Sequence, residues 1–462
     1  MLRVHVVREG GHHYYVNDLV PGRAEGGLVA GEDPGTWSGT GAAALGLRGG
    51  IDFREFAEVL DGRDPVSGSS LRTRRGDRSV AGYDLTFGAP KSVSVLHLLA
   101  PREIATEVGR GHQAAVEEAS GYLGRAAVGV RRSHQGEAAL LPSTGAVAGQ
   151  FLHRTSRTLD PHLHTHLVTA NVAQGVDGRW SAVDSRRLFA HLHAAQGIYH
   201  ARLRLELSER LGATWDVPRS GLGDVVGVDT TLRRLFSQRS AAMGEYRMRR
   251  GRTASGSTRS DGSAYYATRP DKDRSRTVPS LMAEWKQRAS DFGIDLGDLT
   301  RVVGTRLESR HESTIDVERM QAHLAGLALD HRTLARRDLV AEVAAASTVG
   351  ATARTVEWVA GRLAEEAGAA AVVEGRARAE RSDRPTAEPR WRAVDVARAV
   401  EREGERLCLG RGRDDVERGP PGRAALGRAD CGRAELGRGL GAREVERPPR
   451  SFATEATHQL DR

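Results

Sequence analysis

The chain has 462 residues and a formal net charge of +8, with 39% hydrophobic and 28% charged residues. This length allows about three domains of ~150 residues, or one large domain with appendages. No apolar run is long enough to span a membrane, so we exclude a membrane-spanning protein. The first residues lack the apolar core of a signal peptide, which excludes a secreted protein. No GxxxxGK[ST] loop occurs, which excludes a P-loop ATPase or helicase.

Strands and helices are mixed along the first half of the chain. The expected elements, in order, are a strand over 2–7, a long glycine-rich loop over 21–50, a helix over 51–62, a strand over 79–87, a helix from Lys91, a helix over 101–127, a strand-rich stretch over 129–183, a long helix over 185–212 and a strand over 213–217. Because no regular β-α-β repeat appears, the pattern favours an α+β domain with a largely antiparallel sheet.

The surplus positive charge lies in residues 231–280, which contain 12 Lys or Arg and 4 Asp or Glu. Tyr246, Tyr265 and Tyr266 lie among these basic residues. Basic groups interleaved with aromatic rings suit single-stranded DNA, through phosphate contacts and base stacking. A solvated basic loop would have the same composition, so both interpretations stay open at this point.

The composition changes in the last third of the chain. Residues 301–378 are rich in alanine and predict a helical linker region, whereas residues 379–462 approach a repeat of Gly, Arg, Ala and Leu and predict a low-complexity, disordered tail. The two cysteines, Cys408 and Cys431, lie in that tail. They exclude a disulfide scaffold and fit a reducing cytoplasm. The main domain is therefore expected over residues 1–300.

Histidines are densest in FLHRTSRTLDPHLHTHLVTANV, at residues 151–172. The stretch HLHTHLVTANV has the β-branched residues and the period-two alternation of a strand. Side chains two residues apart share a face of a strand, so His162, His164 and His166 should point in one direction.

A turn signal at Asp160-Pro161 predicts a hairpin, which would return His153 to the side of His164 and His166. Neutral imidazoles gathered on one sheet face, without cysteine, suit a divalent metal that keeps open coordination positions. Metal-assisted phosphate chemistry needs such positions. The alternatives are a surface histidine tract and a hydrolytic zinc site of HxHxDH type, against which Leu167 counts because it stands where the acid is wanted.

Tyr14 and Tyr15 follow the first expected strand and could supply a nucleophile. A phenol has a pKa of about 10, so it needs a polarised phosphate or a nearby base. Asp84, on the strand over 79–87, could orient a metal-bound histidine or accept the phenolic proton. Each residue also has an ordinary structural explanation, a packed tyrosine pair or an acid at a strand edge.

Three motifs occur in a fixed order: the tyrosine pair, AGYDLTFGAPKSVS at 81–94, and the histidine motif with spacings of 11 and 2 residues. Together they resemble the TrwC/TraI-type conjugative relaxases, the MobF group of the HUH single-strand endonucleases. The similarity covers roughly residues 1–300, and WSAVDSRRLF, FSQRS and ATRPDKDR extend it.

The resemblance implies a five-stranded antiparallel HUH palm with flanking helices, followed here by the helical segment and the disordered tail. It implies that His153, His164 and His166 hold a divalent metal, most readily Mg or Mn with Zn as another choice, and that Asp84 is the acid beside it. His162 lies where the family does not usually place a ligand.

The implied reaction is site-specific nicking of one DNA strand at a plasmid transfer origin, in which a tyrosine forms a 5′-phosphotyrosyl link and leaves a 3′-hydroxyl. Tyr14 is the first choice of nucleophile and Tyr15 the second. Relatives carry a second tyrosine cluster several residues later. The next tyrosine here is Tyr83, which puts a second nucleophilic step in question.

Expected DNA contacts are Arg78, Lys91, Arg269 and Lys272, and the expected substrate is single-stranded or hairpin DNA at the origin. Relaxosome accessory proteins and a type IV secretion coupling protein are further expected partners, in the cytoplasm and without membrane insertion. Relatives commonly continue into a C-terminal helicase that this sequence lacks, so we expect no unwinding. The alternatives are a catalytically inactive DNA-binding remnant of a truncated relaxase-helicase, and a general metallohydrolase that needs no tyrosine.

Overall fold

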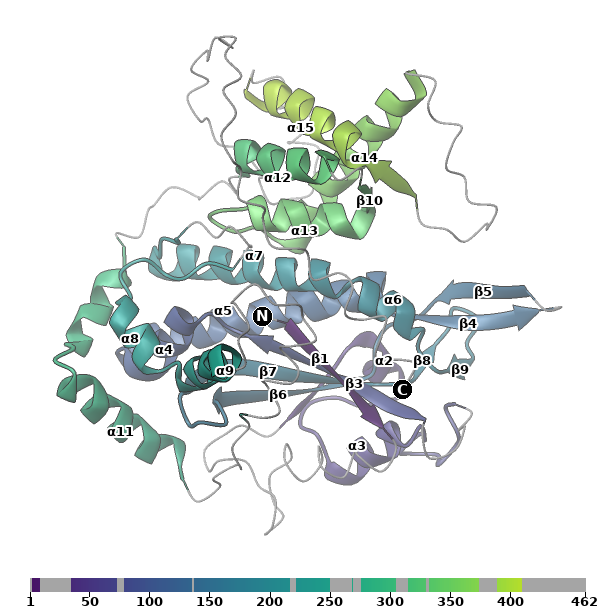
Figure 1. Ribbon diagram of the computed structural model, residues 1–462. Helices are drawn as coiled ribbons and strands as arrows, with labels where there is room; N and C mark the ends of the chain where they lie inside the picture. Colours follow the sequence, from purple (N-terminus) through teal and green to yellow (C-terminus); the bar gives the residue numbers. More distant parts are fainter. Residues whose placement is uncertain are drawn as a thin grey trace, which may run out of the picture.

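A computed structural model of the chain shows a mixed α+β domain with a further group of helices stacked on it (Figure 1). The structure describes residues 2–8, 35–72, 79–134, 137–216, 222–249, 268, 276–304, 315–329, 332–373 and 389–408. Among these residues, no helix combines the length and the apolar character that a membrane crossing requires.

The centre of the domain is a five-stranded sheet in the order β1-β3-β7-β6-β2, and every neighbouring pair in it is antiparallel. Its strands are β1 Leu2–Arg8, β2 Thr36–Ser38, β3 Val80–Gly88, β6 Ala148–Thr155 and β7 Pro161–Ala170. The α+β class and the five-stranded antiparallel palm are therefore confirmed.

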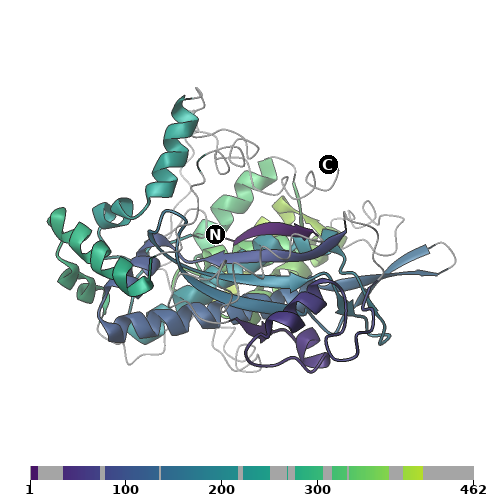
Figure 2. The ribbon, with the colours of Figure 1, turned by 90° about the horizontal axis from the view of Figure 1, so that it is seen from below.

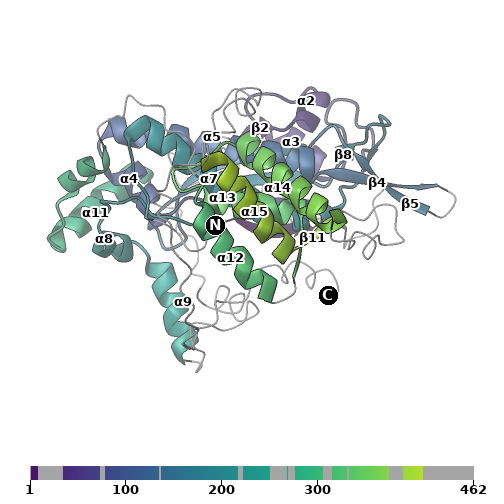
Figure 3. The same cartoon turned by 90° about the horizontal axis from the view of Figure 1, so that it is seen from above.

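Three two-stranded ribbons accompany this sheet: β4 Gly129–His134 with β5 Glu137–Pro142, β8 Ala173–Gln174 with β9 Trp180–Ser181, and β10 Thr333–Ala335 with β11 Arg390–Arg392. The β4–β5 ribbon projects from the body of the domain (Figures 1 and 3).

The helices are α2 Thr40–Ala44, α3 Phe53–Leu60, α4 Lys91–Leu99, α5 Arg102–Ala126, α6 Ser185–Ala190, α7 Leu192–Leu211, α8 Thr230–Leu235, α9 Gln238–Arg249, α11 Val278–Asp291, the 3-10 helix η1 Leu296–Val302, α12 Val317–Leu329, α13 Arg336–Ala346, α14 Ala353–Val373 and α15 Ala393–Cys408. Most of α9 projects away from the domain (Figures 2 and 3). No side chain of α9 that the structure describes is fully buried.

Side-chain alternation gives the sheet two different faces. One face packs against α4, α5 and α7 in the main core, where Tyr83, Leu85 and Phe87 of β3 meet Leu163 and Leu167 of β7. The opposite face is covered at one end by α3, which buries Phe56 in a smaller cluster of apolar residues. The rest of that second face carries polar side chains, and these include the histidines.

The helices α12 to α15 form a unit that rests on α7 (Figure 1). Arg204 of α7 is 1% exposed and donates hydrogen bonds to the backbone oxygens of Ala344 and Ser347 at the C-terminal end of α13. Gly350 follows in the turn with φ 109°, where a Cβ atom would lie 2.1 Å from the Leu205 nitrogen. Glycine is therefore required for this close approach.

Several predicted boundaries differ from the structure. The loop expected over 21–50 contains β2 and α2 in its described part, because residues 36–38 complete the sheet by pairing with β6. The helix expected over 185–212 divides at His191, whose Nδ1 lies 2.8 Å from the Tyr122 hydroxyl. The strand expected over 213–217 is reduced in its described part to one bridge, between Trp215 and Val225.

The tail predicted to lack structure from residue 379 also differs, because its described part forms β11 and α15. The strand pairs with β10, and Val396, Ala399 and Val400 bury the apolar side of the helix in the main core. The helical spacing of these few apolar residues is only a weak indication of a helix, because the sequence that follows them is rich in arginine and glycine. The helical region therefore extends past the boundary expected at residue 378.

Candidate metal centre

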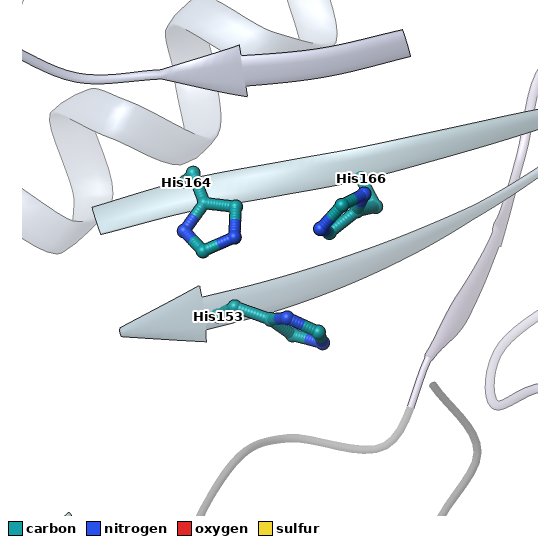
Figure 4. A group of neighbouring side chains, drawn as sticks. All are labelled: His153, His164 and His166. Carbon is teal, nitrogen blue, oxygen red and sulfur yellow. The ribbon is translucent and has the colours of Figure 1, made fainter. Parts of the chain in front are cut away.

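The predicted hairpin forms between β6 and β7, and it places His153 directly opposite His164 (Figure 4). The turn that follows Thr155 is short and includes Asp160, which immediately precedes β7. His166 lies two residues further along β7 and therefore on the same face as His164. Two neighbouring strands thus contribute three imidazoles to one patch of the sheet.

The three rings form a nearly regular triangle. Ring centroids lie 5.3 Å apart for His153 and His164, 5.0 Å for His153 and His166, and 5.1 Å for His164 and His166. One nitrogen of each residue lies within 4.8 Å of the others. Among the described residues, this group could hold one metal ion with three imidazole ligands.

The second nitrogen of two rings is already engaged. Nδ1 of His166 lies 2.9 Å from both carboxylate oxygens of Asp84, and Nδ1 of His164 lies 2.9 Å from the backbone oxygen of His162. Both partners accept hydrogen bonds, so each Nδ1 must carry the proton. A neutral ring then has its lone pair on Nε2, the tautomer in which histidine binds a metal. The donor set therefore fits a divalent cation.

Asp84 is 4% exposed and comes from the middle of β3, beside β7. The hydroxyl of Thr86 lies 3.3 Å from both Asp84 Oδ1 and His166 Nδ1. Asp84 thus lies where it contacts the His166 ring directly, as one of the two roles suggested by the sequence requires, and its role stays a prediction. Sequence reasoning missed Thr86, although it lies two residues from Asp84 and so shares its face.

His162 stacks on His164 with ring centroids 4.4 Å apart and planes inclined by 30°. It is not part of the group of nitrogens that could share a metal. Burial lowers the pKa of His162 well below its usual value, with smaller contributions from His164, Lys91 and Arg3. The expectation that His162 is not a ligand stays a prediction.

The edge strand β1 brings two further polar side chains to the histidine face. Arg3 lies opposite Thr86 and His5 lies opposite Asp84, and both are exposed. Sequence reasoning missed them. The signal was the alternation of LRVHVV, in which Arg3 and His5 occupy one face and Leu2, Val4 and Val6 the other.

Lys91 was expected to contact DNA. Its ammonium donates a hydrogen bond of 2.7 Å to the backbone oxygen of Pro161, where β7 begins. Burial lowers the pKa of Lys91 to about 8, although Asp160 and Asp224 act in the opposite direction. The structure thus places this side chain against the hairpin backbone, and contact with a phosphate remains a prediction.

The other predicted site residues lie outside the described residues: Tyr14, Tyr15, Arg78, Arg269 and Lys272. The structure brings together His153, His164, His166 and Asp84 from the predicted set, and it describes no geometry between them and the tyrosines.

Residues 7–292 match the family model of the TrwC relaxase. The multifunctional conjugation protein TraI of Escherichia coli is 32% identical over 289 residues, which is 60% of this chain. TraI of E. coli strain K12 is 32% identical over 271 residues, or 56% of this chain. The matched regions are 16% and 15% of those proteins, so this chain spans a small part of the length of its curated relatives.

Solved structures of the conjugative relaxase TrwC with oriT DNA, in metal-free and metal-bound forms, are 30% identical to the chain with a TM-score of 0.57. They cover 64% of this chain and 100% of the TrwC chain. TrwC with a 27-mer DNA comprising the recognition hairpin and the cleavage site is 29% identical, with a TM-score of 0.54 and the same coverage.

Proposed function

The chain belongs to the TrwC relaxase family, and from that premise we propose that it nicks one DNA strand at the transfer origin of a plasmid or conjugative element by tyrosine transesterification. The observation that carries the proposal is the histidine triangle, in which three nitrogens lie within 4.8 Å and the Nδ1 atoms of His164 and His166 face acceptors. That arrangement serves metal-assisted phosphate chemistry.

His153, His164 and His166 would hold the metal. When bound, a divalent cation there would polarise the scissile phosphate and stabilise its negative charge in the transition state. Imidazole nitrogens suit zinc, copper, iron and nickel, whereas magnesium prefers oxygen. Manganese, like magnesium, prefers oxygen ligands, so the three imidazoles alone favour zinc or copper, and one TrwC relative was solved in a copper-bound form.

Asp84 would keep the His166 ring in its orientation and tautomer through the pair of contacts at 2.9 Å. Arg3 and His5, exposed on the same face, would contact the phosphates that flank the site. The protein thus supplies orientation and positive charge around the reacting phosphate.

Tyr14 is the proposed nucleophile, with Tyr15 as the second choice. The phenol loses its proton as its oxygen bonds to the phosphorus, the bond from phosphorus to the 3′ oxygen breaks, and that oxygen takes up a proton. The products are a 5′-phosphotyrosyl link and a free 3′-hydroxyl. One phosphodiester replaces another, so resealing needs no ATP.

The chain length between β1 and the tyrosine is compatible with this role. Six peptide units separate Arg8 from Tyr14 and can span about 20 Å. Strand rise and strand spacing place His166, the nearest of the three histidines, about 20 Å from the end of β1, measured back along β1 and across two strands. The tyrosine therefore lies within chain reach of His166.

We further propose single-stranded or hairpin DNA of the origin as substrate, with Arg78, Lys91, Arg269 and Lys272 among its contacts. TrwC itself has been solved with oriT DNA, including a recognition hairpin. Relaxosome accessory proteins, a type IV secretion coupling protein and a cytoplasmic location complete the proposal.

The test is incubation of metal-free protein with single-stranded origin DNA and added Mn²⁺, Mg²⁺ or Zn²⁺, followed by a denaturing gel. We expect a covalent protein–DNA adduct, lost in Tyr14→Phe or, if Tyr15 acts first, in Tyr15→Phe. His193→Ala is a matched control, because His193 is exposed on α7 and belongs to the opposite side of the sheet.

Two other outcomes would overturn the proposal. Cleavage to free 5′-phosphate ends that persists in both tyrosine variants indicates a hydrolase. A shift on native gels without an adduct, under every metal, indicates a DNA-binding protein that does not cut.

A further inference from the structure

The turn of the histidine hairpin contains a buried carboxylate that contacts a distant helix. Asp160 is 1% exposed, and it immediately precedes Pro161, the first residue of β7. It accepts hydrogen bonds from the backbone nitrogen of Gln238 at 2.9 Å and from its side-chain Nε2 at 2.6 Å. Gln238 is the first residue of α9. Asp160 therefore satisfies a backbone donor at the start of α9, as an N-cap residue does, but from another part of the chain.

Other contacts hold the same turn. The Trp285 indole of α11 donates a hydrogen bond of 2.8 Å to the Leu159 backbone oxygen, and Arg288 of α11 lies 3.8 Å from Asp160. Leu159 has φ 56°, and among the described residues no other non-glycine residue has a positive φ. A leucine keeps this unfavourable conformation only where its surroundings enforce it.

Lys91 of α4 also contacts the turn, through its hydrogen bond to the Pro161 backbone oxygen. Pro161 pairs with Thr155, and the neighbouring pair along the hairpin is His153 with His164. Any shift of the turn therefore reaches the two histidines within a few residues of strand.

α9 is attached mainly at its base. None of its described side chains is fully buried, it projects from the domain, and it lies in the basic segment 231–280 (Figures 2 and 3). With so little apolar surface buried along its length, the contacts at Gln238 carry much of its orientation. The same carboxylate thus determines the direction of a basic helix and the position of the hairpin turn.

We propose that Asp160 is a positioning residue that couples DNA held by α9 to the geometry of the histidine triangle. The coupling rests on the proposed function, because that function makes the triangle a metal site and gives the basic segment 231–280, to which α9 belongs, a DNA substrate to bind. By linkage, DNA on α9 raises metal affinity by the same factor by which the metal raises DNA affinity.

The test uses Co²⁺ as a spectroscopic probe of the full-length protein, so it requires no cleavage and is distinct from the adduct assay. Asp160→Asn replaces one acceptor oxygen with a donor that opposes the Gln238 donors. We expect a changed Co²⁺ visible spectrum and a loss of about tenfold in Co²⁺ affinity, the lower end of the effect of residues that orient metal ligands. Gln238→Ala, which keeps the backbone donor, should give a smaller change in the same direction.

Asp184→Asn is the matched control. Asp184 is also a buried carboxylate at a helix start, 7% exposed, and it accepts from the Arg187 backbone nitrogen of α6 at 3.1 Å, but it belongs neither to the hairpin turn nor to α9. We expect its Co²⁺ spectrum and affinity to match those of the unaltered protein.

A second measurement adds a dT oligonucleotide at saturation, with binding followed by fluorescence anisotropy. In the unaltered protein, the oligonucleotide should shift the Co²⁺ spectrum and raise Co²⁺ affinity, and both effects should shrink in Asp160→Asn. If Asp160→Asn lowers only the thermal midpoint and leaves spectrum, affinity and oligonucleotide response unchanged, the residue is merely structural and the proposal is wrong.

Discussion

The two faces of β7 hold histidines in opposite situations. On one face, His164 and His166 each engage Nδ1 with an acceptor and belong to a triangle of nitrogens. On the other face, His112 of α5 is 1% exposed, with Nδ1 2.8 Å from the Tyr199 hydroxyl and Nε2 2.9 Å from the Thr165 hydroxyl. Both of its ring nitrogens are therefore satisfied.

The difference shows what separates a candidate metal ligand from a histidine of the core. Thr165 lies between His164 and His166 in the sequence, so only the alternation of the strand keeps the two environments apart. Burial lowers the pKa of His112 to about 3, and its ring nitrogens are engaged by two hydroxyls. The distance of a histidine from the site therefore does not indicate its function. The hydrogen-bond partners of its two ring nitrogens are the better indicator.

The largest expected effect is the loss of cleavage when a ring of the triangle is removed. In His164→Ala we expect nicking to fall by about a thousandfold or more, because metal stabilisation of transition-state charge is worth several kcal/mol. DNA affinity should stay within about tenfold, since phosphate contacts elsewhere supply most of it. Adduct formation on denaturing gels and fluorescence anisotropy measure the two quantities. Loss of DNA binding together with cleavage would contradict the separation of roles, and His193→Ala should change neither.

The next effect concerns the carboxylate behind His166. Asp84→Asn removes one of the two carboxylate acceptors and allows the ring to adopt its other tautomer. We expect metal affinity to fall by about 10–100-fold, the usual effect of losing a partner that orients a ligand. Isothermal titration with Mn²⁺ measures it, and excess Mn²⁺ should restore part of the nicking rate. Unchanged affinity would mean that Asp84 acts on the phenol instead of on the metal site.

Sequence reasoning identified this site because its signals are local. Period-two alternation and the Asp-Pro turn predicted the hairpin, and the hairpin alone brings His153 to His164. Asp84 was a choice between two roles, and the contact that favours one of them joins residues 82 positions apart. Such pairings depend on strand order, which no local pattern encodes.

The same limit explains what was missed. The sequence predicted only that Asp160 belongs to a turn. Its contact with Gln238, 78 positions away in the sequence, could not be predicted from a local pattern. The sequence predicted that Lys91, at a helix start, contacts DNA, whereas in the fold its ammonium donates a hydrogen bond to the Pro161 oxygen. β2 and α15 contribute too few apolar residues for a clear period, and their pairing partners stabilise them. Propensity is overridden in these places by tertiary contacts.

On the other face of β7, the expected effect is a pH dependence of stability. Folding lowers the pKa of His112 from 6.5 to about 3. Below pH 6.5, His112 therefore binds a proton in the unfolded chain but stays neutral in the folded protein until the pH approaches 3. His112 therefore contributes stability that is complete above pH 6.5 and is lost as the pH falls toward 3. His112→Gln cannot titrate, so its thermal midpoint should fall less steeply between pH 6.5 and 4. Differential scanning calorimetry checks the slope, with His193→Gln as control, and an unchanged slope would refute the assignment.

The smallest expected effects come from two threonines on opposite faces of the sheet. Thr86 of β3 lies on the histidine face, and Thr165 of β7 lies on the face toward α5. Thr86→Val removes a hydroxyl 3.3 Å from its partners on the site side, and contacts of that length are weak. We expect metal affinity to change by less than about tenfold and the thermal midpoint to stay the same.

Thr165→Val leaves the His112 Nε2 without its buried partner, so we expect a loss of about 1–3 kcal/mol in unfolding free energy and no change in metal affinity. Denaturant melts and Mn²⁺ titrations of both variants give the four values. A metal effect in Thr165→Val as large as that in Thr86→Val would mean that the strand transmits packing changes from one face to the other, and the two faces would then not be independent.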